Sequence, residues 1–141
     1  KVSEAMTRNV QVADPGQTIA DAARMMATLD AGSLPVGDGG RLIGMITDRD
    51  IAIRAVANNQ GPDTAIRDVM TNDVKYCFED EDTNHVASNM GDQQVRRLPV
   101  VSRDKRLVGI LSLGDVALAG GSAPAGEALT EISMPGRATS Q

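Results

Sequence analysis

Two short motifs pair a hydroxyl with a carboxylate three residues later, and their residues are the best suited to chemistry in this chain. Thr47 precedes Asp50 in GMITDRD, and Ser112 precedes Asp115 in GILSLGD. Each motif stands where an apolar run ends and a helix is expected to begin. This spacing is typical of a capping box, in which each side chain binds the other residue's backbone N–H. The same helix start can bind a phosphate group, and the carboxylate could accept from both ribose hydroxyls.

A pair of arginines, Arg96 and Arg97, stands before the apolar segment Leu98–Val100. The corresponding positions in the first half of the chain hold no cation. The planar fork of arginine matches phosphate oxygens in a bidentate way, so the pair is a candidate phosphate contact. The alternative is a solvated pair beside Asp92 and Glu81, which would contribute little.

Three further residues are weaker candidates for ligand contact. Tyr76 could lie against an adenine ring, although an aromatic residue on a half-exposed strand is commonplace. Pro35 and Pro99 could shape the wall of a cleft, with packing as their main expected role.

The two soft metal-ligand candidates, Cys77 and His85, do not predict a metal site or an enzyme. A structural zinc site needs about four such ligands at short paired spacings, so we predict no metal. A nucleophilic cysteine needs a base and an orienting third group, and nothing else in the sequence supplies them. We therefore expect no catalytic residues.

The candidate residues belong to an internal duplication. Met70-Thr71 lies 64 positions after Met6-Thr7, and Leu98-Pro99-Val100 follows Leu34-Pro35-Val36 at the same offset. One residue is then inserted, so that Ser112 corresponds to Thr47 at an offset of 65. Such self-similarity constrains the whole fold.

We predict one repeat at residues 1–60, a second at 61–119, and a flexible tail at 120–141 in which one or two helical turns could form. The stretch after Leu118, GGSAPAGEA, has the composition of a linker. Each copy is small for a domain on its own, so we expect the two to share one core across an approximate two-fold axis.

The expected order in each copy is strand, helix, strand, strand, helix, which gives a fold class of α/β (α+β) with tandem β-α-β-β-α repeats. A short helical approach precedes each copy. Apolar residues at helical spacing predict a helix over Ile19–Leu29. The two prolines indicate edge strands or strand starts, and the apolar runs after each hairpin suggest strands buried on both faces. The predicted strands are 10–12, 34–36 and 42–46 in the first copy, with 74–76, 98–101 and 107–111 in the second.

With these motifs the repeat resembles the cystathionine beta-synthase (CBS) domain, and the pair resembles a Bateman module. The matching features are the Met-Thr segment, the hydrophobic-Pro-Val strand and the Gly-hydrophobic-x-Thr/Ser-x-x-Asp motif, over Val2–Ala119. The chain is most similar to small stand-alone bacterial two-CBS proteins of the hypoxic response type. The resemblance implies a homodimer and a regulatory adenosine nucleotide (AMP, ADP or ATP) in a cleft between the copies, with no required cofactor.

Composition limits the other function classes. The net charge is −5 and there is no basic stripe, which argues against a general nucleic-acid binder. No apolar run approaches the roughly 18 residues of a membrane span. The single cysteine and the absence of a signal peptide predict a reducing, cytoplasmic location. Aromatic residues are nearly absent, so aliphatic side chains and methionine must fill the core.

Three functions remain open at this point. The leading hypothesis is a regulatory module that senses an adenosine nucleotide and signals through self-association or an unidentified protein partner. The alternative is a ligand-free scaffold or stress protein that acts by dimerising. An enzyme is the weakest of the three.

Overall fold

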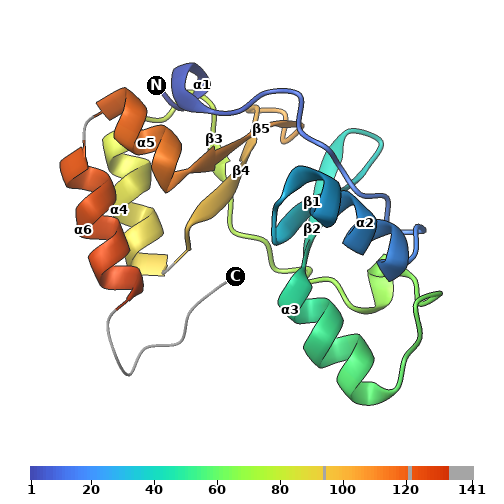
Figure 1. The fold of residues 1–141 in the computed structure, drawn as a ribbon. Helices are drawn as coiled ribbons and strands as arrows, with labels where there is room; N and C mark the ends of the chain where they lie inside the picture. The colour runs from blue at the N-terminus through green and yellow to red at the C-terminus, as the bar shows by residue number, and fades with distance from the viewer. Residues whose placement is uncertain (94, 121, 134–141) are drawn as a thin grey trace. The chain divides into compact units, whose positions relative to one another are not determined.

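The computed structural model describes residues 1–93, 95–120 and 122–133. These residues form two compact units, which Figure 1 shows. The repeat-1 unit is Gln11–Val74, and the repeat-2 unit joins Lys1–Val10 to the chain from Lys75 onward. Both units mix helices with strands, which confirms the α+β class.

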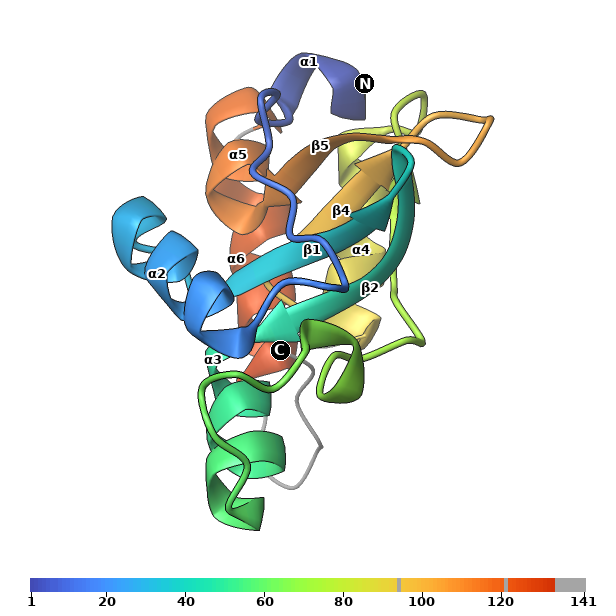
Figure 2. The same cartoon turned by 90° about the vertical axis from the view of Figure 1, so that its right-hand side faces the viewer.

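The repeat-1 unit places helix α2 against a two-stranded antiparallel hairpin (Figure 2). Two glycines with positive φ, Gly39 at 60° and Gly40 at 82°, make the tight turn between its strands. The last strand runs directly into a helical segment that changes from α to π to 3-10 geometry. The elements are α2 (Ile19–Leu29), β1 (Ser33–Asp38), β2 (Arg41–Thr47), α3 (Asp48–Asp50), η1 (Ile51–Ala55), η2 (Val56–Asn58) and η3 (Ile66–Asp68).

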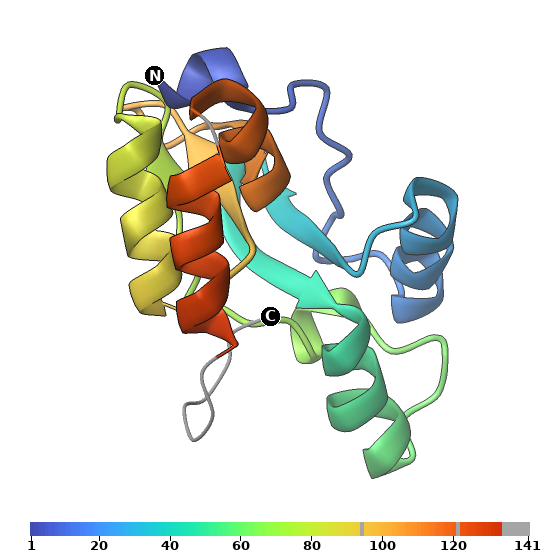
Figure 3. The same cartoon turned by 60° about the vertical axis from the view of Figure 1, so that its left-hand side comes forward.

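The repeat-2 unit has a three-stranded sheet in the order β3-β4-β5 and three longer helices. Helices α4 and α6 lie side by side, as Figures 1 and 3 both show. The elements are α1 (Val2–Ala5), β3 (Cys77–Phe78), α4 (Thr83–Gln93), β4 (Arg97–Val101), β5 (Leu107–Ser112), α5 (Leu113–Gly120) and α6 (Ser122–Ile132).

The two repeats exchange the Met-Thr segments that precede them. Thr7, which leads into the first copy, bridges to Ile110 of β5, donating to its carbonyl at 2.8 Å and accepting from its N–H at 3.0 Å. Thr71, which leads into the second copy, makes the same pair with Met45 of β2 at 2.8 and 3.0 Å. Each hairpin is therefore extended by the segment that precedes the other repeat.

The exchange gives each unit its own hydrophobic core, where the small size of each copy led us to expect one shared core. Val2 and Met6 join the cluster of the repeat-2 unit, which also includes Val86, Met90, Leu98 and Leu111. Ile66 and Val69 join the cluster of the repeat-1 unit, which also includes Ile19, Met26, Leu34 and Ile46. The borrowed residues supply apolar area that neither repeat has alone.

Two glycines allow the exchanged segments to approach the strands. A Cβ atom built on Gly109 would lie 2.6 Å from the Met6 sulfur and 2.9 Å from the Thr7 carbonyl oxygen. A Cβ on Gly44 would lie 2.8 Å from both the Met70 sulfur and the Thr71 carbonyl oxygen. The glycine of each Gly-hydrophobic-x-Thr/Ser motif is thus required by close backbone packing.

The predicted strands at 10–12 and 74–76 do not form. In the first copy the segment makes one isolated bridge, Ala13 to Val36, and Val12 is 41% exposed. In the second copy the strand is displaced to Cys77–Phe78 and has only two residues. Both segments touch their neighbour too briefly for a regular ladder.

The proline prediction is correct for Pro35 on the edge strand β1 and wrong for Pro99, because β4 lies between β3 and β5. Pro99 pairs with Ile110, whose N–H and carbonyl point away from β4 toward Thr7. The missing N–H of proline therefore costs no ladder bond at this position. Burial on both strand faces was also wrong for the apolar runs, since Met45 and Ile110 are only half-buried.

The predicted linker after Leu118 is largely helical. Helix α6 covers Ser122–Ile132 and is longer than the expected turn at 127–132. Ala128 and Ile132 are 3% and 4% exposed and pack in the repeat-2 unit, so burial of these apolar side chains stabilises a segment of weak helix propensity. The remainder of the predicted tail, 134–141, lies outside the described residues.

We predict that Gly109→Ala and Gly44→Ala each lower the free energy of unfolding by about 1–3 kcal/mol, because the added methyl group meets a backbone carbonyl that cannot move freely. Urea unfolding followed by circular dichroism measures the change. Gly61→Ala is the matched control: a Cβ there meets nothing within 4 Å, and we expect a change within about 0.5 kcal/mol. Equal stability of all three variants would contradict the proposed close approach.

Candidate functional site

Thr47 and Asp50 form a complete capping box at the start of α3. The Thr47 hydroxyl oxygen accepts from the Asp50 N–H at 2.9 Å, and the Asp50 carboxylate accepts from the Thr47 N–H at 3.0 Å. Thr47 is only 4% exposed. The capping role predicted from the spacing is confirmed here.

Ser112 and Asp115 repeat this geometry at the start of α5. The Ser112 hydroxyl accepts from the Asp115 N–H at 3.1 Å, and the Asp115 carboxylate accepts from the Ser112 N–H at 2.9 Å. Both copies therefore use one carboxylate oxygen and one hydroxyl lone pair for their own helix. Any ligand must bind to the groups that remain.

The two helix starts differ in the N–H groups that remain. In repeat 1 the carboxylate of Asp48 accepts from the Arg49 N–H at 2.7 Å. In repeat 2 the residue at the position of Asp48 is Leu113, which has no side-chain oxygen. Among the described residues no group accepts from the Gly114 N–H, so this donor is available at the start of α5.

The second carboxylate oxygen of each motif also differs. Asp50 Oδ1 lies 3.7 Å from Nε of Arg54, and the Asp50 side chain is 12% exposed. The residue that corresponds to Arg54 in repeat 2 is Ala119, which cannot form this ion pair. Asp115 can therefore accept from a ligand hydroxyl without competing with a neighbouring guanidinium group.

The structure brings Arg96 and Arg97 to the repeat-2 motif. Arg97 is the ladder partner of Ser112 across β4 and β5, so their side chains leave the same face of the sheet. The Arg96 carbonyl accepts from the Leu113 N–H at 3.1 Å. Both arginine residues are exposed, and no salt bridge from either one is found within the described part of the chain. Glu81, the alternative partner, instead accepts from the Phe78 N–H at 2.8 Å.

The helix starts therefore differ in local charge. Repeat 1 has two carboxylates, Asp48 and Asp50, balanced by two cations, Arg49 and Arg54, with Gly32 and Ser33 on the preceding strand side. Repeat 2 has one carboxylate, Asp115, and two cations, Arg96 and Arg97. The local charge therefore favours an anion more at the repeat-2 helix start than at the repeat-1 helix start.

The weaker candidates take structural positions. Pro35 and Pro99 are both buried. Tyr76 is 41% exposed. Its ring and the Phe78 ring form an edge-to-face pair with their centres 5.6 Å apart. Strand β3, which begins directly after Tyr76, pairs with Val100 and Val101, and these residues lie at the opposite end of β4 from Arg97. A role of Tyr76 in stacking on adenine stays a prediction.

An ion pair fixes the loop beside this aromatic pair. The Arg103 guanidinium binds Asp80 through two hydrogen bonds of 2.8 Å and lies 4.1 Å from the centre of the Phe78 ring. These hydrogen bonds hold the pKa of the Asp80 carboxyl below its usual value. The turn after β3 is thus attached to the β4–β5 hairpin.

Cys77 and His85 do not form a nucleophile and base. Cys77 is 3% exposed, and burial, with a smaller effect of the Glu81 charge, raises the pKa of its thiol to about 12. A reactive cysteine needs the opposite shift. The His85 ring contacts Asn89 at 3.3 Å. Within the described residues no cluster of three or more His, Cys, Asp or Glu side chains could hold a metal ion.

The difference between Asp48 and Leu113 was missed in the sequence analysis, which compared only the hydroxyl and carboxylate positions of the two motifs. Comparing the residue that follows the hydroxyl residue in GMITDRD and in GILSLGD would have shown it. The ion pair between Arg54 and Asp50 could also have been predicted from the sequence, because the two residues have an i, i+4 spacing on an expected helix.

Comparison with known proteins agrees with this architecture. The family model for the CBS domain matches residues 2–56 and 66–121. The chain is 39% identical over 133 residues to the CBS domain-containing protein YhcV of Bacillus subtilis (strain 168), covering 94% of both chains.

Two solved structures extend the comparison. Hypoxic Response Protein I with two coordinated zinc ions has a TM-score of 0.75 and 33% identity, covering 84% of this chain and 97% of that one. CBSX2 in complex with AMP has a TM-score of 0.74 and 27% identity, covering 84% of this chain and 93% of that one. In the part of this chain that the structure describes, no helix is both long and apolar enough to cross a membrane.

We predict that the Cys77 thiol of the folded protein reacts slowly with Ellman's reagent at pH 8 and rapidly once the protein is unfolded in urea. The folded pKa of about 12 lies above the ordinary 9.0, so the thiol's contribution to stability is full below pH 9 and is lost as the pH rises toward 12. Labelling kinetics in both states measure the difference. Equal rates would show that Cys77 is accessible.

Proposed function

This chain belongs to the CBS domain family, and from that premise we propose that it is a regulatory module that binds an adenosine nucleotide at the repeat-2 motif. The ligand would be AMP, ADP or ATP, and the protein would require no cofactor. A relative crystallised with AMP supports this ligand class. A cytoplasmic location belongs to the same proposal.

The available N–H of Gly114 is the observation on which the proposal rests. A phosphate oxygen at the start of α5 would accept from this N–H and from the Ser112 hydroxyl, both aided by the helix dipole. Arg96 and Arg97 would neutralise the phosphate charge, with Arg97 placed by its pairing to Ser112. The second oxygen of Asp115 would accept from the ribose hydroxyls.

The repeat-1 motif is the poorer candidate for the same ligand. The Arg49 N–H, which corresponds to the Gly114 N–H of repeat 2, already donates to the Asp48 carboxylate, and the charge of this carboxylate repels phosphate. The Asp50 carboxylate is already close to Arg54. Thr47 and Asp50 would then act mainly as helix caps, and Pro35 as a packing residue.

Nucleotide binding would regulate by favouring one arrangement of the protein over another, which requires different ligand affinities for the two arrangements. The output would pass to a protein partner or to a second copy of the chain. We propose a homodimer as the working assembly.

The second candidate function is a scaffold that dimerises without ligand. It is favoured by large aliphatic side chains on the surface of the repeat-1 unit: Leu29 is 44% exposed, Ile53 53% and Val56 65%. Exposed apolar side chains of this size are typical of interaction surfaces where they form a contiguous patch.

We predict that Leu113→Asp lowers the affinity for AMP and ATP by about tenfold or more, equivalent to about 1.4 kcal/mol. The new carboxylate would accept from the Gly114 N–H and repel phosphate, as Asp48 does in repeat 1. Isothermal titration calorimetry at fixed salt measures the affinity. Leu113 is partly buried against the core of the repeat-2 unit, so the variant is expected to lose some stability, and thermal unfolding must show that it is folded at the titration temperature.

Asp48→Leu, the reciprocal change in repeat 1, is the matched control and should leave the affinity within about twofold. Arg97→Ala should weaken ATP binding more than binding of adenosine. Unchanged affinity in Leu113→Asp would rule out the repeat-2 site. Absence of heat and of thermal shift with the unmodified protein at millimolar nucleotide would favour the scaffold.

A further inference from the structure

The methionine side chains of the two exchanged Met-Thr segments lie on equivalent glycines. Met6 places its sulfur over Gly109 and Met70 places its sulfur over Gly44. A Cβ atom on Gly44 would lie 2.8 Å from the Met70 sulfur and 3.4 Å from its terminal methyl carbon. The Met70 thioether thus fills the space that a side chain at position 44 would need. A group added to this sulfur on the side of the strand has no room.

The two thioethers differ in their access to water. Met6 is 8% exposed and belongs to the buried core of the repeat-2 unit. Met70 is half-buried and packs against the core of the repeat-1 unit. A dissolved oxidant can therefore reach Met70 more readily than Met6, although both residues have the same structural role.

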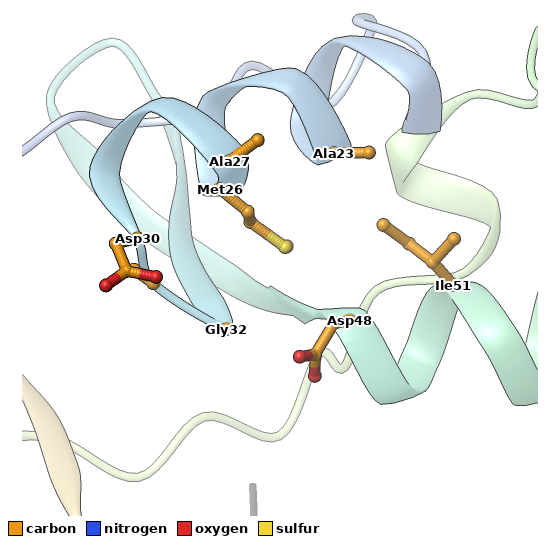
Figure 4. A pocket seen from close by; sticks show the side chains of 8 residues that line it. Ala23, Met26, Ala27, Asp30, Gly32, Asp48 and Ile51 are labelled. Carbon is orange, nitrogen blue, oxygen red and sulfur yellow. The ribbon is translucent and has the colours of Figure 1, made fainter.

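The other methionines of the repeat-1 unit lie elsewhere. Met26 points into a pocket of about 380 Å³ between α2 and the helix that begins at Asp48 (Figure 4), but it is only 6% exposed. Met25 is half-buried on α2. Met45 is also half-buried, and its side chain leaves β2 on the face opposite to that of its neighbour Gly44. A change at the Met70 sulfur is therefore the one that acts directly on the contact with Gly44.

Hydrogen peroxide, a neutral two-electron oxidant, would convert the Met70 thioether into a sulfoxide. A sulfur lone pair attacks one peroxide oxygen, and the S–O bond forms as the O–O bond breaks. The departing hydroxide takes the proton of the transferred oxygen and leaves as water. Sulfur loses two electrons and the peroxide gains them. The product is a polar side chain, and methionine sulfoxide reductases can reverse the reaction.

A sulfoxide at Met70 is incompatible with the contact on Gly44. Its oxygen either meets the strand backbone or places an S–O dipole among apolar side chains, and both are unfavourable. The modified side chain would therefore turn into water. The backbone pair between Thr71 and Met45, with hydrogen bonds of 2.8 and 3.0 Å, would then lose its apolar cover and open more often.

The remaining contacts limit this change to a local opening. The Arg54 guanidinium donates to the carbonyl oxygens of Val69 and Met70 at 3.4 and 3.2 Å, and neither bond involves the Met70 sulfur. Val69 is also buried in the repeat-1 core. Residues 71–74, which end the repeat-1 unit and lead into the repeat-2 unit at Lys75, would be freed while the segment before them stays bound.

We propose that Met70 is a reversible oxidation site whose sulfoxide releases Thr71 from β2 and lengthens the free connection from repeat 1 into repeat 2. Met6 is protected by burial at the equivalent position, so the pairing of Thr7 with Ile110 persists. The proposal goes beyond nucleotide binding and does not depend on it.

Peptide mapping by mass spectrometry after mild treatment of the full chain with hydrogen peroxide tests the site. We expect Met70 to be oxidised at least about tenfold faster than Met6, because reaction follows the exposure of the sulfur. Treatment of the oxidised protein with methionine sulfoxide reductases should return Met70 to the thioether.

Backbone amide hydrogen exchange measures the opening. The N–H groups of Met45 and Thr71 should exchange at least about tenfold faster in the oxidised protein, because local opening exposes them. The N–H groups of Thr7 and Ile110, which form the equivalent pair in repeat 2, should exchange at an unchanged rate. Reduction of the sulfoxide should restore slow exchange at Met45 and Thr71.

Met70→Leu supplies a variant that keeps the apolar side chain but has no sulfur to oxidise at this position. Peroxide should leave the exchange of its Met45 and Thr71 N–H groups slow. Met6→Leu is the matched control in repeat 2 and should remain as sensitive to peroxide as the unmodified protein. Circular dichroism checks that both variants are folded.

Three results would each overturn the proposal. The first is oxidation of Met70 no faster than that of Met6, and the second is unchanged exchange in protein that carries the Met70 sulfoxide. The third is undiminished sensitivity of Met70→Leu, which would assign the effect to another methionine. None of these results bears on the affinity for AMP, which the Leu113→Asp titration tests separately.

Discussion

The backbone pairing between each Met-Thr segment and the opposite hairpin is the constraint on which the other features of this structure depend. It uses both polar backbone groups of Ile110 and of Met45, which leaves the proline on the neighbouring strand without a lost hydrogen bond. It also requires glycine at 44 and 109. The Met-Thr, Pro-Val and Gly-hydrophobic motifs therefore all meet the requirements of the same backbone pairing.

The capping boxes show how a duplicated motif can keep its structural role while its chemistry diverges. Both copies satisfy the same helix-start N–H groups with the same two side chains. The residues between the cap and the carboxylate are free to differ, because no capping bond uses them. One position, Asp48 or Leu113, decides whether an additional N–H is available to an anion.

The sequence predicted the features whose signals are local or periodic. The repeat, the helix at Ile19–Leu29, both hairpins and the capping roles depend on residues close together in the chain. The exchange was not predictable in this way, because Thr7 pairs with a residue more than a hundred positions away. The length of helix α6 was underestimated for a related reason. Its Gly, Ala and Ser composition is typical of a linker, and its packing on α4 and α5, with Ala128 and Ile132 buried, stabilises it as a helix.

The two repeats differ in a consistent direction. Repeat 1 has carboxylates at 30, 48 and 50, with Arg49 and Arg54 beside the last two. The corresponding positions of repeat 2 hold an amide, a leucine and one carboxylate, with two arginines beside them. The same substitutions make repeat 2 the better of the two helix starts for the phosphate of the proposed nucleotide ligand, because they remove carboxylates and add guanidinium groups beside one free N–H.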